Sequence, residues 1–117
     1  MLALTWIKCS NGSSWCPLAT VNLRDVTASG VYMIWHGGNP GRVVRVGQGD
    51  IADRLGCHRN DREVGAHSAH GILYVTWASV AAASQDGVER YLADTWHPLV
   101  GDAFPLALQI AVNSPWS

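Results

Sequence analysis

Four side chains that can bind phosphate or move a proton follow one another between residues 32 and 58. Tyr32 and Arg45 lie in two short runs rich in β-branched and aromatic residues. Arg54 and His58 stand four apart just beyond the second run, so they share one face if that segment is a helix. A guanidinium binds phosphate and stabilises developing charge, and an imidazole can take or relay a proton near neutral pH. If both strand faces look toward the start of the helix, the four side chains converge.

The residues around these side chains predict a β-hairpin that leads directly into a helix. The runs that begin at Gly30 and Arg42 are typical of strands, and segment 36–41 (HGGNPG) consists of turn residues. Asp50 can accept hydrogen bonds from the first free amides of a helix that begins at Ile51. We therefore expect strand, turn, strand and helix in close succession.

This ordered set resembles the first half of a GIY-YIG nuclease domain. Glu89 is similar in type, order and spacing to the metal-binding glutamate on a later helix of that family. The resemblance covers roughly Gly30 to Asp102, a core of about residues 28–104 within a single domain of residues 1–117. It rests on Gly30-Val31-Tyr32, Arg45-Val46-Gly47, Arg54-Leu55 with His58, and Val88-Glu89-Arg90-Tyr91-Leu92 with His97-Pro98.

The chain departs from the family pattern at two positions. Arg45 stands where the family has its second tyrosine. Gly101, with Asp102 beside it, stands where an asparagine is usual. The resemblance implies an α/β (α+β) fold with a small, mostly antiparallel sheet, and a metal-dependent endonuclease that hydrolyses phosphodiester bonds in DNA.

The resemblance also implies roles for individual residues. Tyr32 would act as general base on the attacking water or position it, and His58 would take or relay the proton. Arg54 would bind the scissile phosphate, while Arg45 would hold phosphate or lower the pKa of Tyr32. Glu89 would bind Mg²⁺, or another divalent cation such as Mn²⁺. Further substrate-binding residues are expected at Gly47, Gln48, Arg59, His67 and His70.

Structural explanations remain open beside the functional ones. Tyr32 can be a packing residue of a half-buried strand, and Glu89 can form a buried ion pair with Arg54. His67 and His70 can be solvated residues of a loop. The alternative function is a catalytically degenerate module that binds nucleic acid or a protein partner without cleaving. Exposed tryptophans would serve such contacts, and the candidates are Trp15, Trp35 and Trp116.

Composition limits the partners. The 117 residues fit one domain, and the 48% hydrophobic content favours a compact chain. The net charge of −1 and the single lysine, Lys8, predict weak affinity for DNA, so a protein partner for targeting is an option. The sequence has no apolar run of membrane-spanning length and no signal-type segment, which predicts a cytoplasmic protein without membrane contact.

The cysteine count is odd, and we expect Cys9, Cys16 and Cys57 to be reduced thiols. A zinc site from these cysteines and His58 would match no common ligand spacing. The remaining pattern predicts three to five strands and two or three helices in total. The expected segments are an edge strand over Leu2–Lys8, loops over 9–20 and 60–71, a central strand over Ile72–Ala78, a helix over Gln85–Trp96 with Ser84 as a possible cap, and an extended segment over Leu106–Val112.

Overall fold

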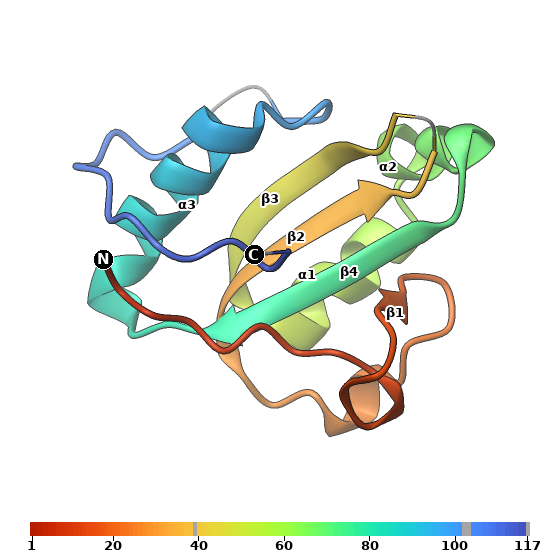
Figure 1. Ribbon diagram of the computed structural model, residues 1–117, viewed down its shortest axis with the longest axis horizontal. Coiled ribbons are helices and arrows are strands. Elements are labelled where there is room, and N and C mark those ends of the chain that lie inside the picture. The colour runs from red at the N-terminus through yellow and green to blue at the C-terminus, as the bar shows by residue number, and fades with distance from the viewer. Residues whose placement is uncertain (39, 102–103, 117) are drawn as a thin grey trace.

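The fold is built on one antiparallel sheet with helices on both faces (Figure 1). The computed structural model describes residues 1–38, 40–101 and 104–116. Its four strands lie in the order β1-β4-β2-β3, and every neighbouring pair is antiparallel. The expected small antiparallel α+β fold is confirmed. The strands are β1 (Cys16–Pro17), β2 (Ser29–His36), β3 (Arg42–Asp50) and β4 (Leu73–Ser79).

Strands β2 and β3 form the hairpin that the sequence predicts. Tyr32 lies opposite Gly47, and Ile34 lies opposite Arg45. Paired residues of an antiparallel ladder point to the same face, so Tyr32 and Arg45 share one side of the sheet. The register shifts between Ile34 and Trp35, within the half of the hairpin nearer the turn. Asn39, in that turn, lies outside the described residues.

Helix α1 (Ile51–Arg59) begins directly after β3, as the sequence predicts. The Asp50 carboxylate accepts a hydrogen bond of 3.2 Å from the Asp53 amide, which satisfies one of the free donors of the first turn. Ile51 and Leu55 are fully buried in one hydrophobic cluster with Tyr32 and Ile34. The cap and this apolar stripe together fix α1 on the face of the sheet that carries Tyr32.

Helix α3 (Ala82–Trp96) covers the opposite face. Its buried residues Val88 and Leu92 pack with Val31, Met33 and Val46 of the hairpin. Side chains of β2 are therefore buried on both faces of the sheet, because each face is covered by a helix. The helix begins three residues before the expected start, and no side chain caps it, so the prediction of Ser84 as a cap is wrong.

The predicted loop over residues 60–71 is largely helical. Helix α2 (Arg62–Ala66) is followed by the 3₁₀ helix η3 (His67–His70). The Asp61 side chain accepts hydrogen bonds from the amides of Glu63 and Val64, and Val64 is fully buried. One buried valine and one capping aspartate are enough to hold this short helix against α1. A single apolar residue, however, gives the sequence no helical periodicity from which the helix could be predicted.

The N-terminal segment differs from the expected edge strand. Residues 3–8 run beside β4 without forming a strand, and the Ile7 amide donates to the Trp77 carbonyl over 2.9 Å. Leu2 pairs with Val112 in an isolated parallel bridge. Segment 9–20, predicted as loop, contains the 3₁₀ helix η1 (Ser10–Gly12) and β1. A second 3₁₀ helix, η2 (Leu23–Asp25), precedes β2.

The expectation of three reduced thiols is wrong. Cys9 and Cys16 form a disulfide, and Cys57 is an exposed free cysteine. A zinc site built on Cys9 and Cys16 is therefore excluded, because thiolates joined in a disulfide cannot bind the metal. Across residues 1–38, 40–101 and 104–116, no helix combines the length and the apolar character needed to cross a bilayer.

Candidate functional site

The centre of the candidate site is a buried hydrogen bond between two predicted catalytic residues. The Tyr32 hydroxyl lies 2.6 Å from Nε2 of His58. Tyr32 comes from the middle of β2 and His58 from the last turn of α1, and both are buried. Gly47 lies against the phenol oxygen, since a Cβ there would overlap it. The absence of a side chain at Gly47 thus makes room for the phenol on the shared face.

Two guanidinium groups flank this pair. The side chains of Arg54 and Arg45 both lie close enough to the phenol to influence its ionisation. Burial raises the pKa of Tyr32, and both arginines partly offset that increase. The contact with Tyr32 raises the pKa of Arg54. Both arginines are partly exposed, so the site presents positive charge to solvent with the phenol beneath it.

His58 is neutral at physiological pH. Burial, together with the positive charges of Arg45 and Arg54, lowers its pKa from 6.5 to about 4. A neutral imidazole has one nitrogen free to accept a proton. In the tautomer with its proton on Nδ1, Nε2 accepts a hydrogen bond from the phenol, while Nδ1 is buried without a partner among the described residues. His58 is therefore placed to act as a base toward Tyr32.

The two departures from the family pattern touch each other. A Cβ at Gly101 would overlap the Arg45 guanidinium, and the φ of Gly101 is +109°, a region that favours glycine. A larger residue at position 101 would therefore displace Arg45. Arg45 Nε is buried without a hydrogen-bond partner in the described structure. Asp102, the other residue noted at this place in the sequence, lies outside the described residues.

Glu89 comes from the side of the sheet opposite Tyr32. Its helix α3 packs on the face opposite Tyr32, and its side chain is only 7% exposed. Burial raises the pKa of Glu89, and the Gln48 amide and the charges of Arg45 and Arg54 partly offset this. Because β3 is the edge strand, the charges of these arginines can reach Glu89 around the edge of the sheet and lower its pKa.

The alternative ion pair of Glu89 with Arg54 is not found. Within the described part of the chain, the single salt bridge joins Arg90 to Asp94. That part also has no group of three or more histidine, cysteine or acidic side chains placed to hold a metal. Glu89 does have Asp86 one helical turn away, and the Asp86 charge raises the pKa of Glu89. One or two carboxylates completed by substrate phosphate fit the way proteins bind Mg²⁺.

The proposed substrate-binding residues are scattered. Gln48 donates a hydrogen bond of 2.6 Å to Asp86 on α3. Arg59 donates to the carbonyls of Leu18 and Val21 over 2.9 and 2.6 Å, which ties α1 to the segment after β1. In the described structure, Tyr32 has no hydrogen bond to Arg59 or Gln48.

The loop histidines lie next to the hairpin turn. The ring of His70 is 5.3 Å from that of His36 and 5.9 Å from that of His67. Burial lowers the pKa of His36, and the charges of His70, His67 and Arg42 add to the effect. The structure therefore groups these histidines with His36, whereas His58 is the histidine beside Tyr32.

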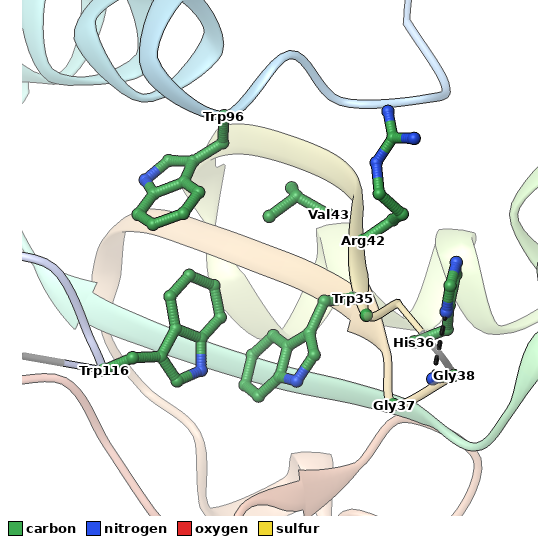
Figure 2. A pocket seen from close by; sticks show the side chains of 9 residues that line it. Trp35, His36, Gly37, Gly38, Arg42, Val43, Trp96 and Trp116 are labelled. Carbon is green, nitrogen blue, oxygen red and sulfur yellow. Dashed lines mark hydrogen bonds between the residues drawn. The ribbon is translucent and has the colours of Figure 1, made fainter.

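A hollow lined by tryptophans lies near the same turn (Figure 2). Of the three tryptophans expected in an exposed patch, Trp35 is buried on β2 and Trp116 is 39% exposed. Trp96 and Arg42 also line this hollow, and the sequence did not single out Trp96. The one sequence signal for Trp96 is its position at the end of a predicted helix, two residues before Pro98.

Comparisons with protein-family models, with curated proteins and with solved structures found no match.

Proposed function

We propose that this chain is a metal-dependent phosphodiesterase that cleaves nucleic acid, of the kind that its resemblance to GIY-YIG nucleases implies. The observation that carries the proposal is the Tyr32–His58 hydrogen bond of 2.6 Å beneath two guanidinium groups. A phosphate that approaches from solvent meets Arg45 and Arg54 first, because both are partly exposed. Their positive charge offsets the charge that builds on the phosphate oxygens in the transition state.

The proton relay follows from the same contacts. Water attacks phosphorus and gives its proton to the Tyr32 oxygen as the phenol proton passes to His58 Nε2, so the new P–O bond forms without a free hydroxide. The bond from phosphorus to the leaving oxygen breaks, that oxygen takes a proton from solvent, and His58 then releases its proton to solvent. Burial is the main cause of the low pKa of His58, and the charges of Arg45 and Arg54, which a bound phosphate would neutralise, lower it further. His58 therefore becomes a better base when substrate is present.

A divalent cation would complete this site. Glu89 and Asp86 are the carboxylates that would hold it, and it would neutralise charge on the phosphate and the leaving oxygen. Binding of a cation favours the ionised form of a carboxylate, which offsets the raised pKa of Glu89.

A second candidate is a module that binds nucleic acid without cutting it. The observation that favours it is the complete burial of Tyr32, whose exposed fraction is 0%. Water must reach the phenol for cleavage, so the side chains that cover Tyr32 must move to admit it. Binding at Arg45 and Arg54 needs no such movement.

An assay of cleavage and binding separates the two candidate functions. The protein is incubated with labelled single-stranded, duplex or branched DNA in the presence of Mg²⁺ or Mn²⁺. We expect Tyr32→Phe to reduce cleavage by about 10²–10⁴-fold while binding is retained. Tyr91→Phe, at a partly buried tyrosine of α3, is the matched control and should cleave as the wild type does. Binding without cleavage by the wild type would support the second candidate, and neither binding nor cleavage would reject both.

A further inference from the structure

Three indoles and an arginine enclose a hollow of about 450 Å³ at the turn end of the hairpin. Trp35 comes from β2, Trp96 ends α3, and Trp116 comes from the segment after Val112. The Trp116 ring lies 5.0 Å from each of the other two and nearly perpendicular to both, at 89° to Trp35 and 79° to Trp96. Volumes of about 300–1,000 Å³ are typical of small-molecule sites.

The tryptophans and the charge lie on different sides of this hollow. Figure 2 shows the indoles on one side, with Arg42 and His36 on the other. The His36 ring is fixed there, because its Nδ1 accepts a hydrogen bond of 3.2 Å from the Gly38 amide. Arg42 is exposed, and no acidic side chain is among the described residues that line the hollow.

This arrangement selects a ligand with one flat ring and one negative group. Indole faces attract flat π systems and also cations. Arg42 opposes a cationic ligand, since it is close enough for its charge to lower the pKa of His36 at the same turn. A purely apolar ligand would leave Arg42 without a partner. A nucleobase with its phosphate meets both requirements.

We propose that the pocket formed by Trp35, Trp96, Trp116 and Arg42 binds one unpaired nucleotide of a nucleic-acid strand. The base stacks on the face of one indole that is not fully buried, Trp116, and meets the nearly perpendicular ring of Trp96 at an edge, while the phosphate contacts Arg42. Stacking on aromatic side chains tolerates any base, so this site reads an unpaired base and carries little sequence preference.

The pocket is independent of the proposed cleavage site. Trp35 packs in the cluster on the α3 face, whereas Tyr32 packs in the cluster on the α1 face. Tyr32 and the pocket therefore lie on opposite sides of β2, and nucleotide binding at the tryptophans does not require Tyr32. The proposal goes beyond the cleavage activity and can hold where that activity fails.

The test is to titrate the full chain with AMP, with adenosine and with inorganic phosphate. Each titration is monitored through the NMR resonances of the indole N–H groups. AMP should shift Trp96 and Trp116 and leave Trp6, whose Nε1 is bonded to the Asn113 carbonyl, unmoved. Phosphate alone should shift none of the indoles. Tyr32→Phe should bind AMP as the wild type does, even where it abolishes cleavage.

Variants separate stacking from charge. Trp116→Ala should weaken AMP and adenosine alike, by roughly 5- to 150-fold, the loss expected for one stacked base. Arg42→Gln should weaken AMP about tenfold and leave adenosine unchanged, because only AMP carries the phosphate. Arg24→Gln is the matched control at another exposed arginine, outside the pocket, and should change neither.

Three results would overturn the proposal. The first is an AMP titration that leaves the resonances of Trp96 and Trp116 in place. The second is unchanged AMP affinity in a Trp116→Ala protein whose Trp6 and Trp77 resonances show it to be folded. The third is tighter binding of choline than of AMP, which would assign the indoles to a cationic ligand instead.

Discussion

The Tyr32 hydroxyl and Gly47 are in direct contact across the β2–β3 ladder, and no Cβ fits between them. The contact places the phenol oxygen under the edge of the sheet, 2.6 Å from His58. A substitution at Gly47 therefore acts on the centre of the site through packing alone.

Gly47→Ala should destabilise the protein by about 1–3 kcal/mol, because the new methyl overlaps a fully buried ring. The measurement is urea unfolding followed by circular dichroism. Gly65→Ala is the matched control on α2, where a Cβ meets nothing within 4 Å, and it should stabilise by about 0.5–1 kcal/mol. Equal effects at the two positions would contradict the Gly47–Tyr32 contact.

Stability should rise with pH between about 4 and 6.5 because of His58. The native pKa is about 4 and the ordinary value is 6.5, so the unfolded chain binds a proton in this window that the native chain does not. The contribution is complete above pH 6.5, is lost as pH falls toward 4, and amounts to at most about 3 kcal/mol. His36 contributes with the same sign, since its pKa is also lowered.

Urea unfolding of the wild type and of His58→Gln at several pH values between 4 and 7.5 isolates the contribution of His58. The variant should show a flatter rise than the wild type. His97→Gln, at an exposed histidine, is the control and should keep the wild-type slope. A wild-type slope in His58→Gln would show that His58 titrates normally.

Glu89→Gln should leave the stability at pH 7 unchanged or raise it. Burial raises the pKa of Glu89, so its ionised form is disfavoured in the native state, and the substitution breaks no ion pair with any residue that the structure describes. Mg²⁺ should raise the melting temperature of the wild type and not that of the variant, because only a carboxylate attracts the ion. Glu63→Gln, at an exposed glutamate, is the control.

A loss of about 3–5 kcal/mol in Glu89→Gln would instead indicate a broken buried pair and remove the basis for a metal at this position.

Affinity for DNA should be weak and only mildly dependent on salt. The net charge is −1, and Arg45 and Arg54 are the guanidiniums at the candidate site. Two neutralised phosphates give a slope of log K against log salt of about −2 for duplex DNA. Fluorescence anisotropy over a series of salt concentrations measures it. A slope near −6 would mean that a wider basic surface takes part.

Reduction of the Cys9–Cys16 disulfide should lower the free energy of unfolding by about 2 kcal/mol. The bond joins residues 7 apart, and closing so short a loop removes little entropy from the unfolded chain. Unfolding with and without a phosphine reductant measures the difference, and Cys57→Ser should not change it. Mass spectrometry of a non-reduced digest checks the pairing, and a free Cys16 would disprove it.

The sequence by itself determined the elements whose signals are local. The hairpin followed from two β-branched runs around turn residues, and α1 followed from Asp50 before an apolar stripe. The convergence of Tyr32 and Arg45 followed from strand alternation, which fixes the face of each side chain once the hairpin is accepted. Local rules sufficed because each of these features spans only a few neighbouring residues.

Tertiary structure decided what depends on distant segments. Residues 62–70 are helical because Val64 is buried against other elements, and Cys9 pairs with Cys16 because the turn at η1 brings the two together. The sequence could not show that Tyr32 is fully buried or that Glu89 has no ion pair among the described residues, since both depend on which elements cover them. The tryptophan pocket exists for the same reason: its three indoles come from β2, α3 and the segment after Val112, and only packing on one face of the sheet joins them.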